Sequence, residues 1–268
     1  MKIENFGMSD VGCKREKNED SFFVSDALGL YMVADGMGGH VGGEFASKLA
    51  VKTVEQIVTQ LTQDPDTTLQ EETHLKPNDY KGWLQYSLMM ASHAVYDVAA
   101  KDPALQGMGT TAVVLFFKKN RVYIANVGDS RCYRVRGHKM EQMTTDHSLV
   151  AEQMRAGILK PKEAKEHRLK NIITRSVGFQ DVVEADIEAR SVKVGDIYML
   201  CSDGLHNLLE EDEIRDILIH QGLKDSCKHL IDIAKARGGD DNITVVLAKA
   251  LSLEEADPSE DEESTLQF

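Results

Sequence analysis

The sequence predicts an α+β fold, in which helices cover a layered sandwich of mostly antiparallel strands. Short runs rich in β-forming residues lie close together in the chain, as hairpins require. Two long helix-like stretches stand grouped between these hairpins, whereas a doubly wound parallel sheet would place a helix after almost every strand. The grouping therefore favours packed antiparallel sheets with helices outside them.

The strand prediction depends on short apolar runs. Their ranges are 20–25, 30–34, 110–118, 121–127, 194–202 and 243–250. Only Lys119 and Asn120 separate the third run from the fourth, and a connection that short joins antiparallel neighbours. We expect these two runs to form a hairpin.

Three segments have the apolar periodicity of helices. In residues 44–61 the apolar side chains recur on one face, and residues 80–100 repeat this pattern. A third helix is predicted over 225–237. The polar segment 62–79 contains two prolines and is typical of a loop between the first two helices.

One further segment interrupts the pattern within a predicted globular domain of residues 1–251, and an acidic segment follows that domain. Residues 148–180 begin with the helix-like stretch SLVAEQMRAG and form either a flap over a site or a surface insertion; the residues alone favour an insertion. Residues 252–268 hold seven acidic residues and no Lys or Arg. We expect these last residues to be a disordered acidic tail.

Composition disfavours several classes of protein. No apolar run approaches the roughly 20 residues of a membrane span, and the N-terminus lacks the apolar stretch of a secretory signal. The four cysteines lie far apart without a C-x-x-C pair, which argues against a zinc site or a disulfide framework. The net charge of -13 argues against nucleic acid as a partner. We expect a cytoplasmic protein without a membrane partner.

Aspartates border most of the predicted strands. They are Asp20, Asp35, Asp129, Asp203 and Asp241. A single Asp-Gly or Asp-Asn pair is usually a turn. Five carboxylates at strand ends would converge if those strands share one sheet edge, and buried like charges are costly without a counter-charge.

A hard divalent cation is the simplest counter-charge. Mg²⁺ and Mn²⁺ prefer oxygen ligands, whereas no His or Cys spacing here suits zinc. Two such cations could share a carboxylate and a hydroxide, which supplies a nucleophile at neutral pH. Arg15 lies shortly before Glu19 and Asp20, and a guanidinium there suits the capture of a phosphate. The glycines from Gly36 onward match no phosphate-binding motif and are interpreted as permitting a close backbone approach to a metal.

The motifs as a set resemble those of the bacterial type-2C protein phosphatases, the metal-dependent PPM family. The resemblance covers nearly all of residues 5–250 in the order of the family's motifs. The matching segments are G-x-x-R-x-x-N-E-D-S from Gly12, V-A-D-G-M-G-G-H-x-x-G-E from Val33, G-T-T from Gly109, N-x-G-D-S-R from Asn126, T-x-D-H-S from Thr144, S-D-G-L from Ser202 and D-N-I-T from Asp241.

The resemblance implies a four-layer αββα sandwich with a metal site at one edge of its two sheets. Asp35 would bridge two core Mn²⁺ or Mg²⁺ ions, and the Gly36 carbonyl would bind one of them. Asp203 and Asp241 would complete this core site.

It also implies a flap subdomain at about residues 148–180, and roles for residues around the core. Asp20 would contribute directly or through water, and Glu19 would orient coordinated waters. Asp129 matches the family's aspartate for a third ion. Arg15 would hold the substrate phosphate, and His40 is the candidate that protonates the leaving group.

The implied function is the hydrolysis of phosphoserine and phosphothreonine in proteins by direct attack of a metal-bridging hydroxide. The implied partners are phosphorylated proteins and a cognate Ser/Thr kinase, and we expect a monomer. The alternative is a catalytically weak phosphoprotein-binding module of the same fold. A two-metal nuclease or phosphodiesterase would need a basic groove, which the charge of -13 disfavours.

Overall fold

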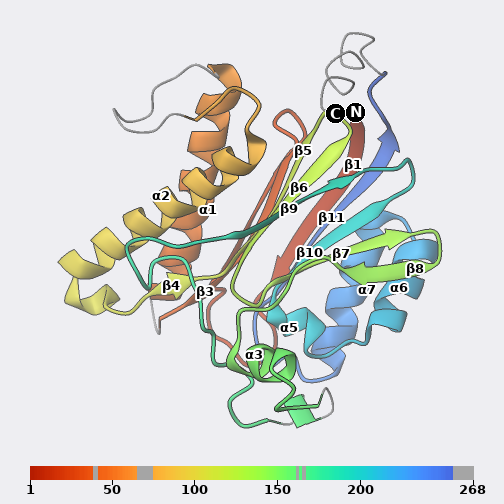
Figure 1. The fold of residues 1–268 in the computed structure, drawn as a ribbon. Helices are drawn as coiled ribbons and strands as arrows, with labels where there is room; N and C mark the ends of the chain where they lie inside the picture. Colours follow the sequence, from red (N-terminus) through yellow and green to blue (C-terminus); the bar gives the residue numbers. More distant parts are fainter. Residues whose placement is uncertain (39–41, 65–74, 161–162, 165–166, 256–268) are drawn as a thin grey trace.

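Two antiparallel sheets packed face to face, with helices on both outer faces, make up the fold (Figure 1). This computed structural model describes residues 1–38, 42–64, 75–160, 163–164 and 167–255. The arrangement confirms the predicted four-layer sandwich. The predicted acidic tail lies almost wholly outside the described residues.

The first sheet has the strand order β1-β11-β10-β7-β8, and every pair in it is antiparallel. Its strands are β1 (Lys2–Asp10), β7 (Arg131–Arg136), β8 (Lys139–Gln142), β10 (Ile197–Cys201) and β11 (Ile243–Ser252). Its outer face carries α5 (Asp203–His206), α6 (Glu211–His220) and α7 (Leu223–Ala236). The helix predicted over 225–237 is α7.

The second sheet has the order β2-β3-β5-β6-β9, and a short β4 extends the end of β3. Its strands are β2 (Asp20–Ser25), β3 (Leu30–Met37), β4 (Gly109–Thr110), β5 (Ala112–Lys118), β6 (Arg121–Val127) and β9 (Asp186–Ser191). Its outer face carries α1 (Gly42–Gln63) and α2 (Tyr80–Lys101), followed by the 3₁₀ turn η1 (Pro103–Leu105). The helices predicted over 44–61 and 80–100 are confirmed.

Aromatic side chains fill the space between the two sheets. Phe117 contacts Tyr31 and Tyr198 edge to face, with ring centroids 5.7 and 5.5 Å apart. Such contacts add to the free energy gained by burying the rings. Cys201 is fully buried, as its place in an apolar run predicts.

The predicted hairpin is formed by β5 and β6. Lys119 and Asn120 both have positive φ, at 50° and 56°. Two consecutive residues with positive φ define a type I′ turn, whose twist matches that of the flanking strands.

Several strand boundaries differ from the prediction; the run predicted over 110–118 divides into β4 and β5, and β11 continues to Ser252. β3 continues through Asp35 to Met37, because Gly36 and Met37 pair with β4. β10 begins at Ile197 rather than at 194, because Gly195 adopts a φ of +88° in the turn before it. Four further strands, β1, β7, β8 and β9, were not predicted, because their polar residues conceal the apolar alternation.

At the start of the segment 148–180, α3 (Leu149–Arg155) lies near α5 at one end of the sandwich (Figure 1), and towards the end of the segment Val177 bridges to Thr110 of β4. Ser148 caps α3 by accepting a hydrogen bond from the Ala151 amide. Within the described ranges, no helix has the length and apolar character needed to span a lipid bilayer.

Candidate active site

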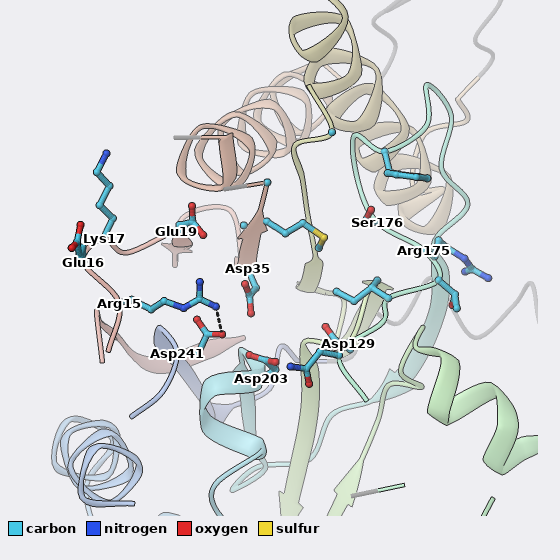
Figure 2. A pocket seen from close by; sticks show the side chains of 18 residues that line it. Arg15, Glu16, Lys17, Glu19, Asp35, Asp129, Arg175, Ser176, Asp203 and Asp241 are labelled. Carbon is cyan, nitrogen blue, oxygen red and sulfur yellow. Dashed lines mark hydrogen bonds and ion pairs between the residues drawn. The ribbon is translucent and has the colours of Figure 1, made fainter. Parts of the chain in front are cut away.

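A cleft of about 760 Å³ opens at this end of the sandwich. Its lining includes Asp35, Asp129, Asp203 and Asp241, which lie around a common space in Figure 2. Asp35 comes from β3, Asp129 follows β6, Asp203 begins α5 after β10, and Asp241 precedes β11. Four of the five aspartates singled out in the sequence therefore meet in one cleft.

The backbone of Asp35 is fixed on both sides. Its amide donates to Thr111 Oγ1 at 2.9 Å, and its carbonyl accepts from the Thr111 amide and from Thr110 Oγ1, each at 2.9 Å. Asp35 thus lies inside a strand rather than after one, which corrects the predicted strand end. Its carboxylate is held in place by the strand itself.

Asp20 is the fifth aspartate and lies buried beside the cleft, opposite Asp35 in the β2–β3 register. Its Oδ2 accepts hydrogen bonds from Ser202 Oγ at 2.8 Å and Thr244 Oγ1 at 2.6 Å. Its Oδ1 has no hydrogen-bond partner among the described residues. A buried acceptor without a partner is unusual in a folded protein, and its free lone pairs suit a cation or a hydrogen-bond donor.

The carboxyl groups raise one another's pKa. Burial, followed by the negative charges of its neighbours, raises the pKa of Asp35 well above its usual range. Burial raises the pKa of Asp20 to about 7 even though the Thr244 and Ser202 hydroxyls lower it. Burial and then like charge also raise the pKa of Asp129 to about 7 and that of Asp203 to about 6. The cluster therefore needs protons or cations near neutral pH.

Arg15 reaches into the cleft and pairs with Asp241. Its Nη2 donates to Asp241 Oδ2 at 2.8 Å (Figure 2). This interaction, opposed in part by burial, raises the pKa of Arg15. The cleft thus contains a guanidinium beside the carboxylates, as the sequence predicts.

Asn242 holds the Arg15 loop against β11. Its Nδ2 donates to the carbonyls of Val11 and Lys17, each at 2.9 Å, and its Oδ1 accepts from the Glu19 amide at 2.7 Å. Asn242 is a positioning residue that sequence reasoning did not assign. Its place directly after Asp241 in the D-N-I-T motif is the signal that could have identified it.

The Asp129 loop is fixed by two histidines. The Gly128 amide donates to His147 Nδ1 at 3.0 Å, and His206 Nε2 lies 3.0 Å from the Asp129 carbonyl. His147 Nε2 lies 3.1 Å from Asp186 Oδ2 of β9 but makes no hydrogen bond among the described residues. His147 therefore fixes the Asp129 loop through the Gly128 amide.

Gly36 is required by the packing of the chain around it. A Cβ at this position would lie 2.1 Å from the Gly43 carbonyl oxygen and 2.5 Å from that of Glu19. The sequence predicts that Gly36 lets the backbone approach a metal closely. In the structure, the absence of a side chain also lets Gly36 pack against the backbone of Glu19 and Gly43. The Glu19 side chain lines the cleft, as predicted for a residue near the site.

Residues 148–180 supply one wall of the cleft. The wall consists of Asn171, Ile173, Thr174, Arg175, Ser176 and Phe179. The residues alone favoured a surface insertion, and this lining overturns that interpretation. No role at the site was assigned to these side chains from the sequence, because nothing local shows that the segment folds back over the aspartates. His40 lies outside the described residues.

The donor groups suit hard divalent cations. The carboxylates, the orphaned Asp20 Oδ1 and the Gly36 carbonyl offer only oxygen, which Mg²⁺ and Mn²⁺ prefer. In the described part of the chain, no three His, Cys, Asp or Glu side chains converge tightly enough to enclose one ion. Mg²⁺ commonly uses one or two carboxylates and keeps several waters, so an open arrangement still fits such ions.

Comparison with known proteins agrees with this geometry. The family model for protein phosphatase 2C matches residues 5–243. The chain belongs to this family and is a protein serine/threonine phosphatase. The resemblance seen in the motifs is confirmed.

Individual relatives cover almost the whole chain. The protein phosphatase PhpP of Streptococcus pneumoniae is 39% identical over 246 residues, which is 90% of this chain and 94% of PhpP. The crystal structure of the Mycobacterium tuberculosis phosphatase PstP/Ppp matches with a TM-score of 0.83 at 31% identity, covering 93% of this chain and 99% of that one. A PstP catalytic domain in complex with two manganese ions matches with a TM-score of 0.80 at 31% identity, over the same shares of the two chains.

Proposed function

We propose that the chain hydrolyses phosphoserine and phosphothreonine in proteins with the help of divalent cations held in the aspartate cleft. The observation that carries this proposal is the convergence of four aspartates on one cleft with a fifth buried beside Asp35. The raised pKa values of these carboxyl groups support it, because cations would relieve their repulsion.

Two core ions, Mn²⁺ or Mg²⁺, are proposed at Asp35, Asp203 and Asp241, with the Gly36 carbonyl as a further ligand. The similarity to a phosphatase that holds two manganese ions supports this number. When bound, such ions lower the pKa of a coordinated water and so supply hydroxide at neutral pH.

The surrounding residues have proposed roles of their own. Asp20 completes the core site directly or through water, and Glu19 orients waters at the cleft. Asp129 serves a third ion, which the rigid loop around Gly128 supports.

Arg15 is proposed to bind the phosphate of the substrate. Its guanidinium already lies in the cleft, and a planar fork of donors matches two phosphate oxygens. In the proposed reaction, a hydroxide derived from water would attack the phosphorus directly. The P–O bond to the substrate's Ser or Thr side chain breaks, and no residue of this chain becomes phosphorylated. The leaving alkoxide needs a proton, for which His40 is proposed from the sequence.

The substrates are proposed to be phosphorylated proteins, so a Ser/Thr kinase must act before this enzyme on the same residues. The test is a comparison of hydrolysis rates on a phosphothreonine peptide, a phosphotyrosine peptide and a phosphodiester, with Mn²⁺, with Mg²⁺ and with a chelator. We expect metal-dependent hydrolysis of the phosphothreonine peptide. A higher rate on the diester, or full activity in chelator, would contradict the proposal.

A further inference from the structure

Phe179 is an exposed aromatic residue in the wall of the active-site cleft. Its side chain is 68% exposed, and it lines the same cleft as the aspartates. Among the large apolar side chains exposed in the described residues, Phe179 alone lines this cleft. A single exposed apolar residue is ordinary. Whether Phe179 contacts a substrate therefore depends on its position in the cleft and on how firmly its backbone is held.

A single side chain of α2 holds the backbone on both sides of Phe179. Ser92 Oγ accepts from the Gly178 amide at 2.9 Å and donates to the Gln180 carbonyl at 2.7 Å. Gly178 has a φ of +90°, and a Cβ there would lie 2.1 Å from Val95 Cγ1. The turn that carries Phe179 therefore packs directly onto α2.

Further hydrogen bonds extend this support along the segment. Gln85 donates to the Val183 carbonyl at 2.9 Å and accepts from the Ala185 amide at 3.0 Å. Thr110 and Val177 exchange two backbone hydrogen bonds of 2.9 Å each. The phenyl ring is thus presented by a backbone that is already ordered, so a ligand that contacts it does not have to order the segment.

The position of Phe179 relative to Asp35 follows from strand pairing. Met37 of β3 pairs with Gly109 of β4, and the next residue of β4 bridges to Val177. Adjacent strands lie about 4.8 Å apart, so Val177 lies about two strand spacings, or about 10 Å, from the Asp35 strand. Phe179 stays close to β4, because a Cβ at Gly109 would lie 3.8 Å from the Phe179 amide nitrogen. An extended peptide advances about 3.3–3.6 Å per residue. A substrate phosphorylated at the aspartates would therefore bring a residue two or three positions away beside Phe179.

The wall around Phe179 is mixed in character. Ile173 lies in the same wall, whereas its other members are polar or charged: Asn171, Thr174, Arg175 and Ser176. Arg15 also lines the cleft, and its charge suits the phosphate. Phe179 thus offers a local apolar contact in a cleft whose other side chains are mostly polar or charged.

We propose that Phe179 forms an apolar subsite, which favours phosphoproteins with a Leu, Ile, Met or Phe side chain two or three residues from the phosphorylated Ser or Thr. The inference rests on the proposed function, since it requires a phosphopeptide in the cleft. Contact between an apolar side chain and a held ring is worth about tenfold in kcat/KM, as for one small apolar group in an enzyme pocket.

The test uses phosphothreonine peptides that are identical except at the neighbouring positions. One peptide carries Ala at every position, and the others carry Leu at two or three residues before or after the phosphothreonine. With Mn²⁺ we expect kcat/KM about tenfold higher for at least one Leu peptide than for the Ala peptide. In Phe179→Ala this ratio should fall close to one, and in Phe179→Leu it should be intermediate.

Val182→Ala provides the matched control. Val182 lies three residues after Phe179 and is 62% exposed but does not line the cleft, so this variant should keep the preference of the unaltered protein. Equal kcat/KM for all peptides, or an undiminished preference in Phe179→Ala, overturns the subsite while the phosphatase activity stands. No hydrolysis of any peptide with either cation would instead contradict the proposed function.

Discussion

Arg15 Nη2 and Asp241 Oδ2 lie 2.8 Å apart, although 226 residues separate them in the chain. The pair joins the residue proposed to bind phosphate with a residue proposed to bind a cation. The Arg15 side chain is 49% exposed, so solvent screens the pair and its net contribution is about 0.2–1 kcal/mol. A cation that binds Asp241 therefore competes with a weak partner and leaves the guanidinium available to the substrate.

Replacing Arg15 should affect cation binding and catalysis in opposite directions. In Arg15→Gln we expect the Mn²⁺ affinity, measured by titration calorimetry, to rise by up to about fivefold. The guanidinium no longer competes with the cation for the Asp241 carboxylate, and this competition is worth up to about 1 kcal/mol. The same variant should lose about 100-fold in kcat/KM on a phosphothreonine peptide, because a charged, bidentate phosphate contact is lost. The neighbouring Lys14→Gln is the control, since Lys14 is exposed and does not line the cleft. Weaker Mn²⁺ binding in Arg15→Gln would contradict this account.

The stability of the metal-free protein should fall as the pH rises. The folded-state pKa values of Asp20 and Asp129 are about 7 and that of Asp203 is about 6, whereas an unfolded Asp titrates near about 3.9. Between these values the folded state binds more protons, and each such proton costs up to about 1.4 kcal/mol of stability per unit of rising pH. In chelator, the melting temperature should therefore fall from pH 5.5 to pH 7.5.

Cations should remove this dependence, because they replace the protons. With saturating Mn²⁺ we expect a nearly constant melting temperature over the same range. In chelator, Asp20→Asn should show a smaller fall than the unaltered protein, since one of the titrating groups is gone. A metal-free melting temperature that rises with pH would show that these carboxyl groups do not repel one another as described.

Neutralising Asp35 should stabilise the metal-free protein while abolishing its activity. Asp35→Asn removes a negative charge that four other aspartates oppose, which we expect to add about 1–2 kcal/mol, or a few degrees in melting temperature. Hydrolysis of the phosphothreonine peptide should fall at least 1000-fold, because a carboxylate proposed to hold the core ions is lost. Circular dichroism melts and steady-state rates provide both measurements.

Asp146→Asn is the control for Asp35→Asn, because it neutralises a buried aspartate that faces a positive charge rather than other aspartates. Asp146 accepts hydrogen bonds from Arg131 Nε and Nη2, the shortest at 2.7 Å, and both side chains are largely buried. Removing its charge leaves the Arg131 guanidinium without its partner and should cost about 2–4 kcal/mol. If Asp35→Asn destabilised the metal-free protein as much as Asp146→Asn does, the repulsion between the cleft carboxylates would be refuted.

Asp129 should affect rate more than core cation binding. Its loop is held by His147 and His206 independently of Asp35 and Asp241. In Asp129→Ala we expect calorimetry to show two Mn²⁺ ions bound with unchanged affinity, while kcat falls about 10- to 100-fold. If this variant bound neither core ion, Asp129 would be needed for the core site itself and would not serve a separate third ion.

Much of the fold could be predicted because its central strands are apolar on both faces. β3 and β5 are buried almost throughout, so their composition alone marks them. β9 has the sequence DIEARS with four exposed residues, and its pairing with β6 cannot be detected from such a segment. β1 was not predicted either. Its pairing partner β11 lies at the other end of the chain, so no neighbouring strand in the sequence indicates it.

The site was predictable where residues border strands and unpredictable where distant segments meet. Asp35 and Asp241 follow from local patterns and family motifs. The burial of Asp20 depends on hydroxyls of Ser202 and Thr244, which lie 182 and 224 residues away. The place of Phe179 in the cleft depends on its turn being held against α2, for which the sequence has no local signal.

The most direct test of the central claim is anomalous scattering at the manganese edge from a crystal grown with Mn²⁺. The account predicts two strong peaks in the cleft, within coordination distance of Asp35, Asp203 and Asp241, with Arg15 Nη2 no longer bonded to Asp241. A cleft without peaks at saturating Mn²⁺, or peaks bound only at other surface carboxylates, would contradict it.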